Sequence, residues 1–410
     1  MRLSNFKLNP DLILLSGFLV LATVHLNKAI LEFYTGKLFI VFGEAYYSVT
    51  VLIFIFIYFQ YSSKINFLIF LLFGFLILAG ITQLLNTNML DDKNFFTYGR
   101  MIFINLLTVL AGGLIHKPKN ILKLTNILFY VSLGAVTIGM VQFFFRPSFL
   151  MQFVMQMKEI DPEKTNILGA FRISGLTGSS VTYSLACAFI FYFAMITKSK
   201  IEQLFAVFGM LVSLSRISLV LMFSLGFLYL LMARLYRTLI LNLALIIATV
   251  SASLYYLYTI SPFGFHYVID RLSKIFIPSD DKSFADGRIE RWSTEVLPRI
   301  MEHPFGLGIG STGTREHFDG YQITPFLTES IYLQFFVELG VLPGALILLS
   351  VIFATIILLT RIFSGRATVI ALFTVHYFIA GIISPINSAM PFSCVAYLCL
   401  GSVFLKKFSK

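Results

Sequence analysis

The sequence predicts an all-α integral membrane protein with about 12 transmembrane helices and one large extracytoplasmic loop. Of the 410 residues, 58% are hydrophobic and 12% are charged, and the mean hydropathy is +0.86. A soluble domain carries roughly 25% charged residues, so this composition is typical of a polytopic membrane protein. The main exception is residues 260–328, where charged side chains are frequent.

Apolar runs long enough to form membrane-spanning helices follow one another along most of the chain. A helix needs roughly 17–25 mostly apolar residues to cross the hydrocarbon core. The predicted spans are residues 11–27, 38–60, 64–85, 100–115, 121–145, 177–197, 201–215, 216–233, 238–259, 329–360, 367–384 and 389–405. We therefore divide the chain into residues 1–259 with helices 1–9, the large loop 260–328 with short amphipathic helices, and residues 329–410 with helices 10–12.

The charges of the connecting segments predict which side of the membrane each segment faces. With a cytoplasmic N-terminus, the cytoplasmic segments hold fifteen basic and two acidic residues, and the remaining sixteen basic and eighteen acidic residues lie on or toward the other side. This distribution follows the positive-inside rule and places both termini in the cytoplasm. The net charge of +11 therefore reflects topology, and nucleic acid is not an expected partner.

Cysteine and histidine give no sign of a disulfide, a metal site or a cofactor. Cys187, Cys394 and Cys399 all fall within apolar spans and have no CxxC spacing. We expect them to be buried as small hydrophobic side chains. The six histidines are scattered without ligand spacing, so we expect metal-independent chemistry and no cofactor.

The large loop contains a candidate amphipathic helix followed by a glycine-rich turn. In residues 286–302, Ile289, Trp292, Val296 and Ile300 recur at helical spacing. His303-Pro304 should end this helix, because a residue before proline is pushed out of the helical region. The following run, Phe305-Gly-Leu-Gly-Ile-Gly-Ser-Thr-Gly313, predicts a tight loop that another backbone or a ligand can approach.

Three arginines are predicted to reach the outer membrane face from separate segments. Arg172 lies near the end of the second outer loop, Arg216 lies between two apolar runs, and Arg288 opens the helix of the large loop. The planar guanidinium group binds phosphate oxygens in pairs, which suits an anionic lipid headgroup such as a pyrophosphate. The alternative for Arg216 is an interfacial anchor whose side chain extends to water.

Glu329 is the candidate general base, because it lies where the large loop re-enters the membrane. A carboxylate there could accept the proton of a sugar hydroxyl. The alternative is a helix N-terminal carboxylate stabilised by the helix dipole. Glu338, which lies deeper, more plausibly pairs with an arginine or caps a broken helix. Further candidate substrate-binding residues are Arg291, His303, Tyr321 and Tyr332.

Several of these motifs together resemble the O-antigen polymerase and O-antigen ligase superfamily. They are Ser215-Arg216 at a helix start, Gly287-Arg288 followed by Trp292, His303-Pro-Phe-Gly-Leu-Gly308, and Tyr332-Leu-Gln334 with Glu338 and Gly340. The resemblance, which spans residues 172–344, implies a GT-C-like multispan glycosyltransferase. Such enzymes use undecaprenyl-pyrophosphate-linked glycans at the periplasmic face, hold the pyrophosphate with arginines, and need neither a metal nor a nucleotide sugar.

One departure from the family pattern bears on the choice between polymerase and ligase. The ligase branch carries His-Asn where the large loop meets the next helix, whereas this chain has Glu329-Ser330 there. We therefore expect a polymerase that joins lipid-linked repeat units into a surface polysaccharide of the O-antigen, capsule or exopolysaccharide type. An O-antigen ligase remains the alternative, and a polysaccharide flippase ranks third because the charges gather on one face.

The predicted setting follows from the same resemblance. The protein should lie in the bacterial inner membrane as a multi-pass protein, with its active site facing the periplasm. Its expected partners are the undecaprenyl-pyrophosphate-linked glycan, membrane lipid and a chain-length regulator protein.

Overall fold

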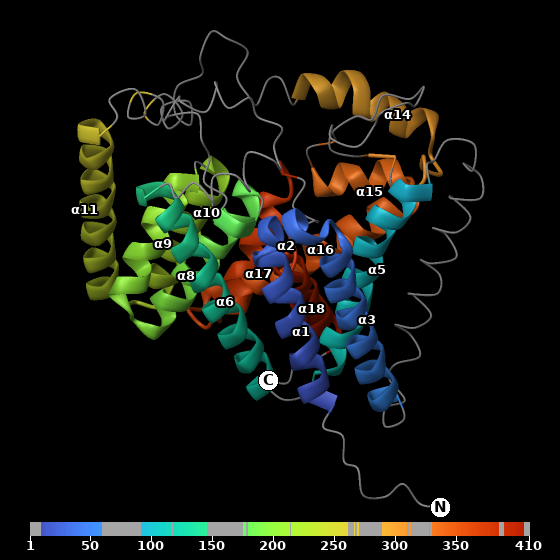
Figure 1. The fold of residues 1–410 in the computed structure, drawn as a ribbon, viewed down its shortest axis with the longest axis horizontal. Coiled ribbons are helices and arrows are strands. Elements are labelled where there is room, and N and C mark those ends of the chain that lie inside the picture. Colours follow the sequence, from blue (N-terminus) through green and yellow to red (C-terminus); the bar gives the residue numbers. More distant parts are fainter. Residues whose placement is uncertain are drawn as a thin grey trace, which may run out of the picture.

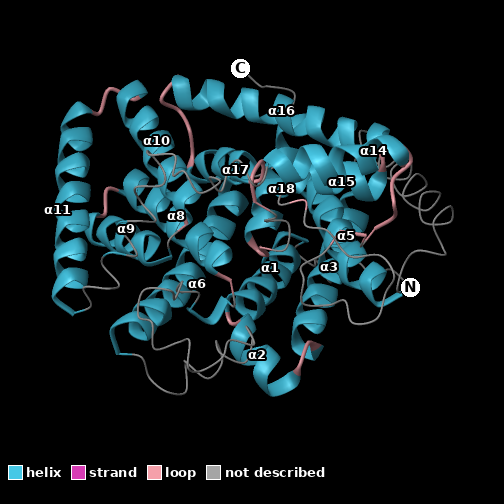
Figure 2. Cartoon of the chain, turned by 90° about the horizontal axis from the view of Figure 1, so that it is seen from above, coloured by secondary structure: helices cyan, strands magenta, loops and turns pink. Residues whose placement is uncertain are grey.

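The regular secondary structure of the described residues is helical, which confirms the all-α part of the predicted fold class (Figures 1 and 2). A computed structural model describes residues 10–59, 92–115, 118–145, 175–177, 179–213, 215–260, 266, 269, 289–309, 311–312, 328, 330–384 and 389–405. The helices of the first part are α1 (Pro10–Leu26), α2 (Lys28–Thr35), α3 (Leu38–Phe59), α5 (Asp92–Leu114), α6 (Pro118–Phe145), η3 (Gly175–Thr177), α8 (Ser180–Thr197), α9 (Lys200–Ser213), α10 (Arg216–Met232) and α11 (Tyr236–Ile260). The second part contains η4 (Trp292–Val296), α14 (Leu297–Glu302), α15 (Ile331–Leu339), α16 (Val341–Phe363), α17 (Val369–Ala380) and α18 (Phe392–Leu405).

Most of these helices lie where the apolar runs predicted them, with two differences. The predicted span 329–360 is wrong as one continuous helix, because the chain breaks at Gly340 between α15 and α16. Gly340 has a φ of 92°, which lies outside the helical region. Helix α5 begins at Asp92 and not near residue 100, so it has a polar first turn that the hydropathy pattern excluded. The predicted span 64–85 lies outside the described residues.

The described residues include five helices that are long and apolar enough to cross a membrane. Their apolar parts are Leu38–Ile57, Leu122–Phe145, Ser180–Thr197, Tyr236–Tyr256 and Val341–Phe363. Helices α1 and α2 pass the same test together, although they are bent by 78° at Asn27. Further apolar helices, Gly99–Leu114, Arg216–Met232, Val369–Ala380 and Phe392–Val403, are shorter. The protein is therefore a multi-pass membrane protein, and twelve spans remain a prediction.

The helices differ strongly in how much of their surface the protein covers. Helix α8 is 72% buried over its apolar window, and α17 and α18 are buried along most of their length. By contrast, α11 stands at the edge of the bundle and only 6% of its window is buried (Figures 1 and 2). Such an apolar and exposed helix is suited to contact with lipid. Cys187, Cys394 and Cys399 are buried and free, which confirms their predicted role as core side chains.

The large loop's helices lie at one end of the bundle. Figure 1 shows α14 and α15 at the end opposite the start of α1, and the bend between α1 and α2 lies toward the same end. With a cytoplasmic N-terminus, this end is the outer one.

Candidate active site

The glycine-rich turn after α14 is joined to the break between α15 and α16 by backbone hydrogen bonds. The amide of Leu307 donates to the carbonyl of Val337 at 2.7 Å, and the amide of Gly308 donates to the carbonyl of Glu338 at 3.1 Å. In the other direction, the amide of Val341 donates to the carbonyl of Pro304 at 2.8 Å. We call residues 304–308 together with 337–341 the glycine junction. The prediction that another backbone approaches the glycine loop is confirmed.

Two glycines make this approach sterically feasible. Gly306 has a φ of 87° and Gly340 a φ of 92°, values that L side chains rarely adopt. A Cβ atom on Gly306 would lie 2.6 Å from the amide nitrogen of Gly340, and one on Gly340 would lie 2.6 Å from the carbonyl carbon of Phe305. Both distances are far shorter than a normal contact, so each glycine is required by the backbone of the other segment.

The buried side chain of Glu338 binds the glycine-rich run Phe305–Gly313 to α15. Its side chain is fully buried, with a relative exposure of 0%. One carboxylate oxygen, Oε1, accepts a hydrogen bond from Gln334 Nε2 at 3.1 Å and another from the hydroxyl of Thr312. A buried carboxylate requires such donors, because an ionised group without them would be costly. Glu338 therefore joins α15 to Thr312, near the end of the glycine-rich run, close to the helix break.

The amphipathic helix of the large loop packs on the same junction. Val296 and Ile300 are buried with Leu307 and Val337 in one small apolar cluster, and Trp292 packs against it. The helix ends at Glu302, and His303 is its C-cap, as the His-Pro pair predicted. The prediction was wrong for Ile289, which is 59% exposed. The turn Trp292–Val296 is π-helical, and its extra residue per turn moves Ile289 out of line with the buried side chains.

Trp292 also reaches the segment that leads into α15. Its indole Nε1–H donates to the carbonyl of Thr328 at 2.7 Å. Thr328 and Ser330 are both buried, and the Thr328 hydroxyl donates to the Ser330 carbonyl at 3.1 Å. These bonds fix both residues that flank Glu329. Glu329 itself lies outside the described residues.

The start of α15 is held against the end of α17. The amide of Ile331 donates to the carbonyl of Gly381 at 2.9 Å. The hydroxyl of Tyr332, predicted to bind substrate, donates to the carbonyl of Phe378 at 2.7 Å. The described structure thus gives the Tyr332 hydroxyl a backbone partner within the protein.

The remaining predicted site residues are only partly within the described part of the chain. Arg216 is the first residue of α10 and is half-buried, and the N-cap residue before it, Ser215, has an extended backbone. Arg291 is half-buried in the helical segment before Trp292. The amide of His303 donates to the carbonyl of Arg299 at 3.0 Å, and its carbonyl accepts from Gly306 at 2.8 Å. The other candidates, Arg172, Arg288, Tyr321 and Glu329, lie outside the described residues, so the convergence of the arginines remains a prediction.

Sequence reasoning missed Thr312 and Gln334 as partners of Glu338. Gln334 stands one helical turn before Glu338, and this i,i+4 spacing was a usable signal. Thr312 had no such signal, because its contact depends on the path of the glycine loop. Within the described residues, no group of three His, Cys, Asp or Glu side chains is arranged to hold a metal ion.

Comparison with known families decides what kind of domain contains this junction. The match is to the O-Antigen ligase family and covers residues 203–349. Residues 203–349 form an O-antigen ligase family domain. No curated protein and no solved structure matches the chain. The resemblance found from the motifs is confirmed for this part of the chain.

The O-antigen ligase family domain contains nearly all of the candidate site. It begins within α9, includes α10, α11, the large loop and α15, and ends within α16. Both halves of the glycine junction therefore belong to it, as do Arg216 and Glu329. Arg172 precedes it. The family assembles polysaccharides from lipid-linked glycans at the inner membrane, through ligases and polymerases.

Proposed function

We propose that this protein polymerises undecaprenyl-pyrophosphate-linked oligosaccharide repeat units into a surface polysaccharide at the outer face of the inner membrane. The observation that carries the proposal is the O-antigen ligase family domain, in which Glu329-Ser330 stands at the entry to α15. The ligase branch that the sequence resembles has His-Asn at this point. The acceptor would therefore be a second lipid-linked repeat unit and not a lipid A core.

In the proposed reaction, a hydroxyl oxygen of the acceptor sugar attacks the anomeric carbon of the donor glycan. The bond from that carbon to the pyrophosphate oxygen breaks, and the pyrophosphate leaves with the bonding electrons. Arg216 and Arg288 bind this leaving group, with Arg172 and Arg291 beside them, because preorganised positive charge stabilises the charge that develops there. His303, Tyr321 and Tyr332 complete the substrate-binding set. The large loop covers the site and excludes water, which would otherwise hydrolyse the donor.

The position of Arg216 supports a role in anion binding. It is the first residue of α10, where the positive end of the helix dipole disfavours a cation by about 0.3–1 kcal/mol. A bound phosphate would reverse this cost, because the helix N-terminus and the guanidinium group then attract the same anion. An arginine that served only as a membrane anchor would be better placed at a helix C-terminus.

The proton of the acceptor hydroxyl would pass to Glu329. Helix α15 begins at Ile331 with Ser330 as its N-cap, so Glu329 precedes the cap. Helix-dipole stabilisation is largest within the first turn and is weaker outside it. This position favours the general base over the alternative of a carboxylate that only stabilises the helix start.

The arginines can be tested with purified full-length protein and a lipid-linked repeat unit, in the presence of EDTA and without nucleotide sugar. Arg216→Ala and Arg288→Ala should abolish polymer on a gel, and the corresponding Lys variants should restore little because lysine lacks the planar fork. Arg361→Ala, in the last turn of α16 at the predicted cytoplasmic side, is the matched control and should form normal polymer. Normal polymer from well-folded Arg288→Ala protein, or a strict requirement for added Mg²⁺ or Mn²⁺, would contradict the proposal.

Glu329→Gln tests the base separately, because glutamine keeps the shape of the side chain but cannot take the proton. Turnover should fall by about 10²–10⁴-fold while donor affinity stays nearly constant. Near-normal turnover would remove Glu329 from the mechanism. Transfer to a lipid A core acceptor without polymer formation would favour the ligase, which the family description also covers.

A further inference from the structure

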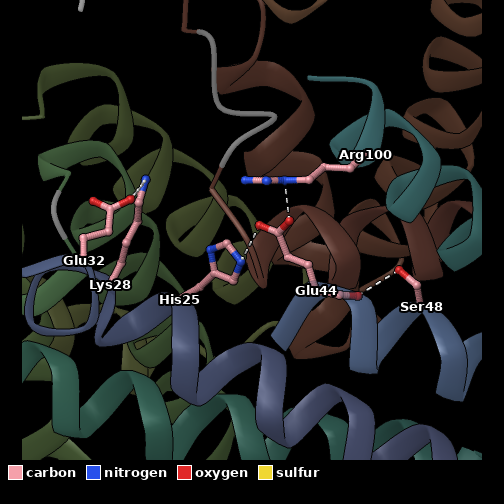
Figure 3. Close-up of polar contacts among 6 residues, drawn as sticks. All are labelled: His25, Lys28, Glu32, Glu44, Ser48 and Arg100. Carbon is pink, nitrogen blue, oxygen red and sulfur yellow. Dashed lines mark hydrogen bonds and ion pairs between the residues drawn. The ribbon is translucent and has the colours of Figure 1, made fainter. Parts of the chain in front are cut away.

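Three ionisable side chains from separate helices form a cluster outside the O-antigen ligase family domain. Glu44 of α3 lies between His25 of α1 and Arg100 of α5 (Figure 3). His25 Nε2 is 3.1 Å from Glu44 Oε1, and Arg100 Nε is 2.6 Å from Glu44 Oε2. We call these three residues the ion cluster. The predicted mechanism uses none of them.

His25 and Glu44 of the ion cluster are buried, whereas Arg100 is partly exposed. The side chains of His25 and Glu44 are 4% and 2% exposed, whereas that of Arg100 is 26% exposed. Each oxygen of Glu44 lies within ion-pair distance of a nitrogen from another helix, and Arg100 is the member whose side chain is partly exposed and able to bind something else.

The contact between Glu44 and Arg100 sets the orientation of the guanidinium group. The ion pair joins Glu44 Oε2 to Arg100 Nε, and in Figure 3 the two terminal nitrogens lie further out along the side chain. Among the described residues, Glu44 is the ion-pair partner recorded for Arg100. The edge formed by the two terminal nitrogens is the one that binds two oxygens of a phosphate in parallel. A buried carboxylate therefore holds an arginine with its phosphate-binding edge available.

The place of the ion cluster in the fold limits what it could bind. Arg100 lies eight residues after the start of α5, about 12 Å along the helix axis, at the predicted outer end of that helix. His25 is close to the bend between α1 and α2, also toward the outer end. Helices α5 and α10 stand on opposite sides of the central helices in both views of the molecule (Figures 1 and 2). Arg100 and Arg216 are thus on helices that lie apart, and both residues are predicted to face the outer side of the membrane.

We propose that Arg100, held by Glu44 and His25, is a second phosphate-binding site, which takes the pyrophosphate of the acceptor substrate. This inference rests on the proposed function. A polymerase that joins two lipid-linked glycans must accommodate two pyrophosphate headgroups at once, because the donor loses its headgroup while the acceptor keeps its own. The arginines of the O-antigen ligase family domain bind the headgroup of the donor. We assign the second headgroup to Arg100, which is the partly exposed member of the ion cluster.

Binding of undecaprenyl pyrophosphate to the purified full-length protein, counted by native mass spectrometry in detergent, tests the inference. Wild type should bind two equivalents. Arg100→Ala and Arg216→Ala should each bind one, and the double variant none. Arg100→Lys keeps the charge beside Glu44 and so should fold even if Arg100→Ala does not, yet its second equivalent should bind about tenfold more weakly. Arg361→Ala is the control and should keep both equivalents.

The outcomes separate this inference from the proposed function. Two tightly bound equivalents in both Arg100 variants would overturn the second site, whatever Arg216→Ala does. If Arg216→Ala keeps two equivalents while Arg100→Lys loses one, the donor assignment of Arg216 fails and the Arg100 site stands. A parallel titration with phosphatidylglycerol distinguishes the source of the phosphate. Displacement of the Arg100-dependent equivalent by an equal concentration of that lipid would overturn the acceptor assignment.

Discussion

The glycine junction and the ion cluster both lie toward the predicted outer end of the molecule, but they are held together by different forces. In the glycine junction, backbone amides and carbonyls of the large loop pair with those at the break between α15 and α16, and two glycines let the backbones meet. In the ion cluster, the side chains of three helices meet. A side chain added at Gly306 or Gly340 should therefore disrupt the glycine junction, whereas removal of a charged group should disrupt the ion cluster.

Gly340→Val should have the largest effect, because it places a branched side chain where the backbone of Phe305 already lies within 2.6 Å of the added Cβ. The glycine junction should fail to form, with loss of polymer formation and a large fall in the melting temperature in detergent. Gly36→Val is the matched control, since Gly36 also has a positive φ, of 59°, but nothing lies within 4 Å of its added Cβ. Its cost should be limited to backbone strain of about 1–3 kcal/mol. Equal effects of the two substitutions would show that close approach of the backbones does not matter.

Glu44→Ala should have the next largest effect, because it leaves His25 and Arg100 without their shared carboxylate. Breaking a buried ion pair costs about 3–5 kcal/mol, and we expect the lower end because Arg100 can reach water. Glu32→Ala removes an i,i+4 pair with Lys28 at the more exposed α2 and should cost less than about 0.5 kcal/mol. Equilibrium unfolding of both variants gives the comparison. A cost for Glu44→Ala as small as that for Glu32→Ala would mean that the ion cluster contributes little to stability.

Trp292→Phe should have the smallest effect of the three, because it removes one hydrogen bond and little apolar surface. The lost bond to the carbonyl of Thr328 should lower stability by about 1 kcal/mol. Ser293→Ala is the control, since the Ser293 hydroxyl bonds only the carbonyl of Glu290 within its own exposed turn. Hydrogen exchange at Thr328 and Ser330 should increase in the Trp292 variant alone. Unchanged exchange there would show that the indole does not fix the segment around Glu329.

The local sequence predicted the C-terminal end of the large loop's helix, whereas hydropathy placed residues 329–360 in one span despite the break at Gly340. The His303-Pro304 pair stops a helix through the geometry of its own residues, so no distant contact was needed. The run 329–360 is mostly apolar, and hydropathy cannot distinguish one helix from two. Pro343 carried the missing signal, because proline is well tolerated in the first turn of a helix and α16 begins at Val341.

The candidate site residues were chosen because they stand beside recognisable motifs. Arg216 follows a serine at a helix start, and the family match now includes it. Tyr332 was predicted to bind substrate, yet its hydroxyl donates to a carbonyl on α17, which no motif reveals. The ion cluster was missed as well, although His25 and Glu44 are ionisable residues within predicted apolar spans, which is a signal of a buried partner.

By itself, the sequence determined the helical class, the apolar segments, the glycine loop and the family of residues 203–349. These features follow from the composition and spacing of neighbouring residues, which set how a segment is buried and where its helix ends. Only the tertiary structure decided that the glycine loop pairs with the end of α15 and that Glu44 joins His25 to Arg100. A buried polar group must find a partner, but which partner it finds depends on how helices distant in the sequence pack against one another.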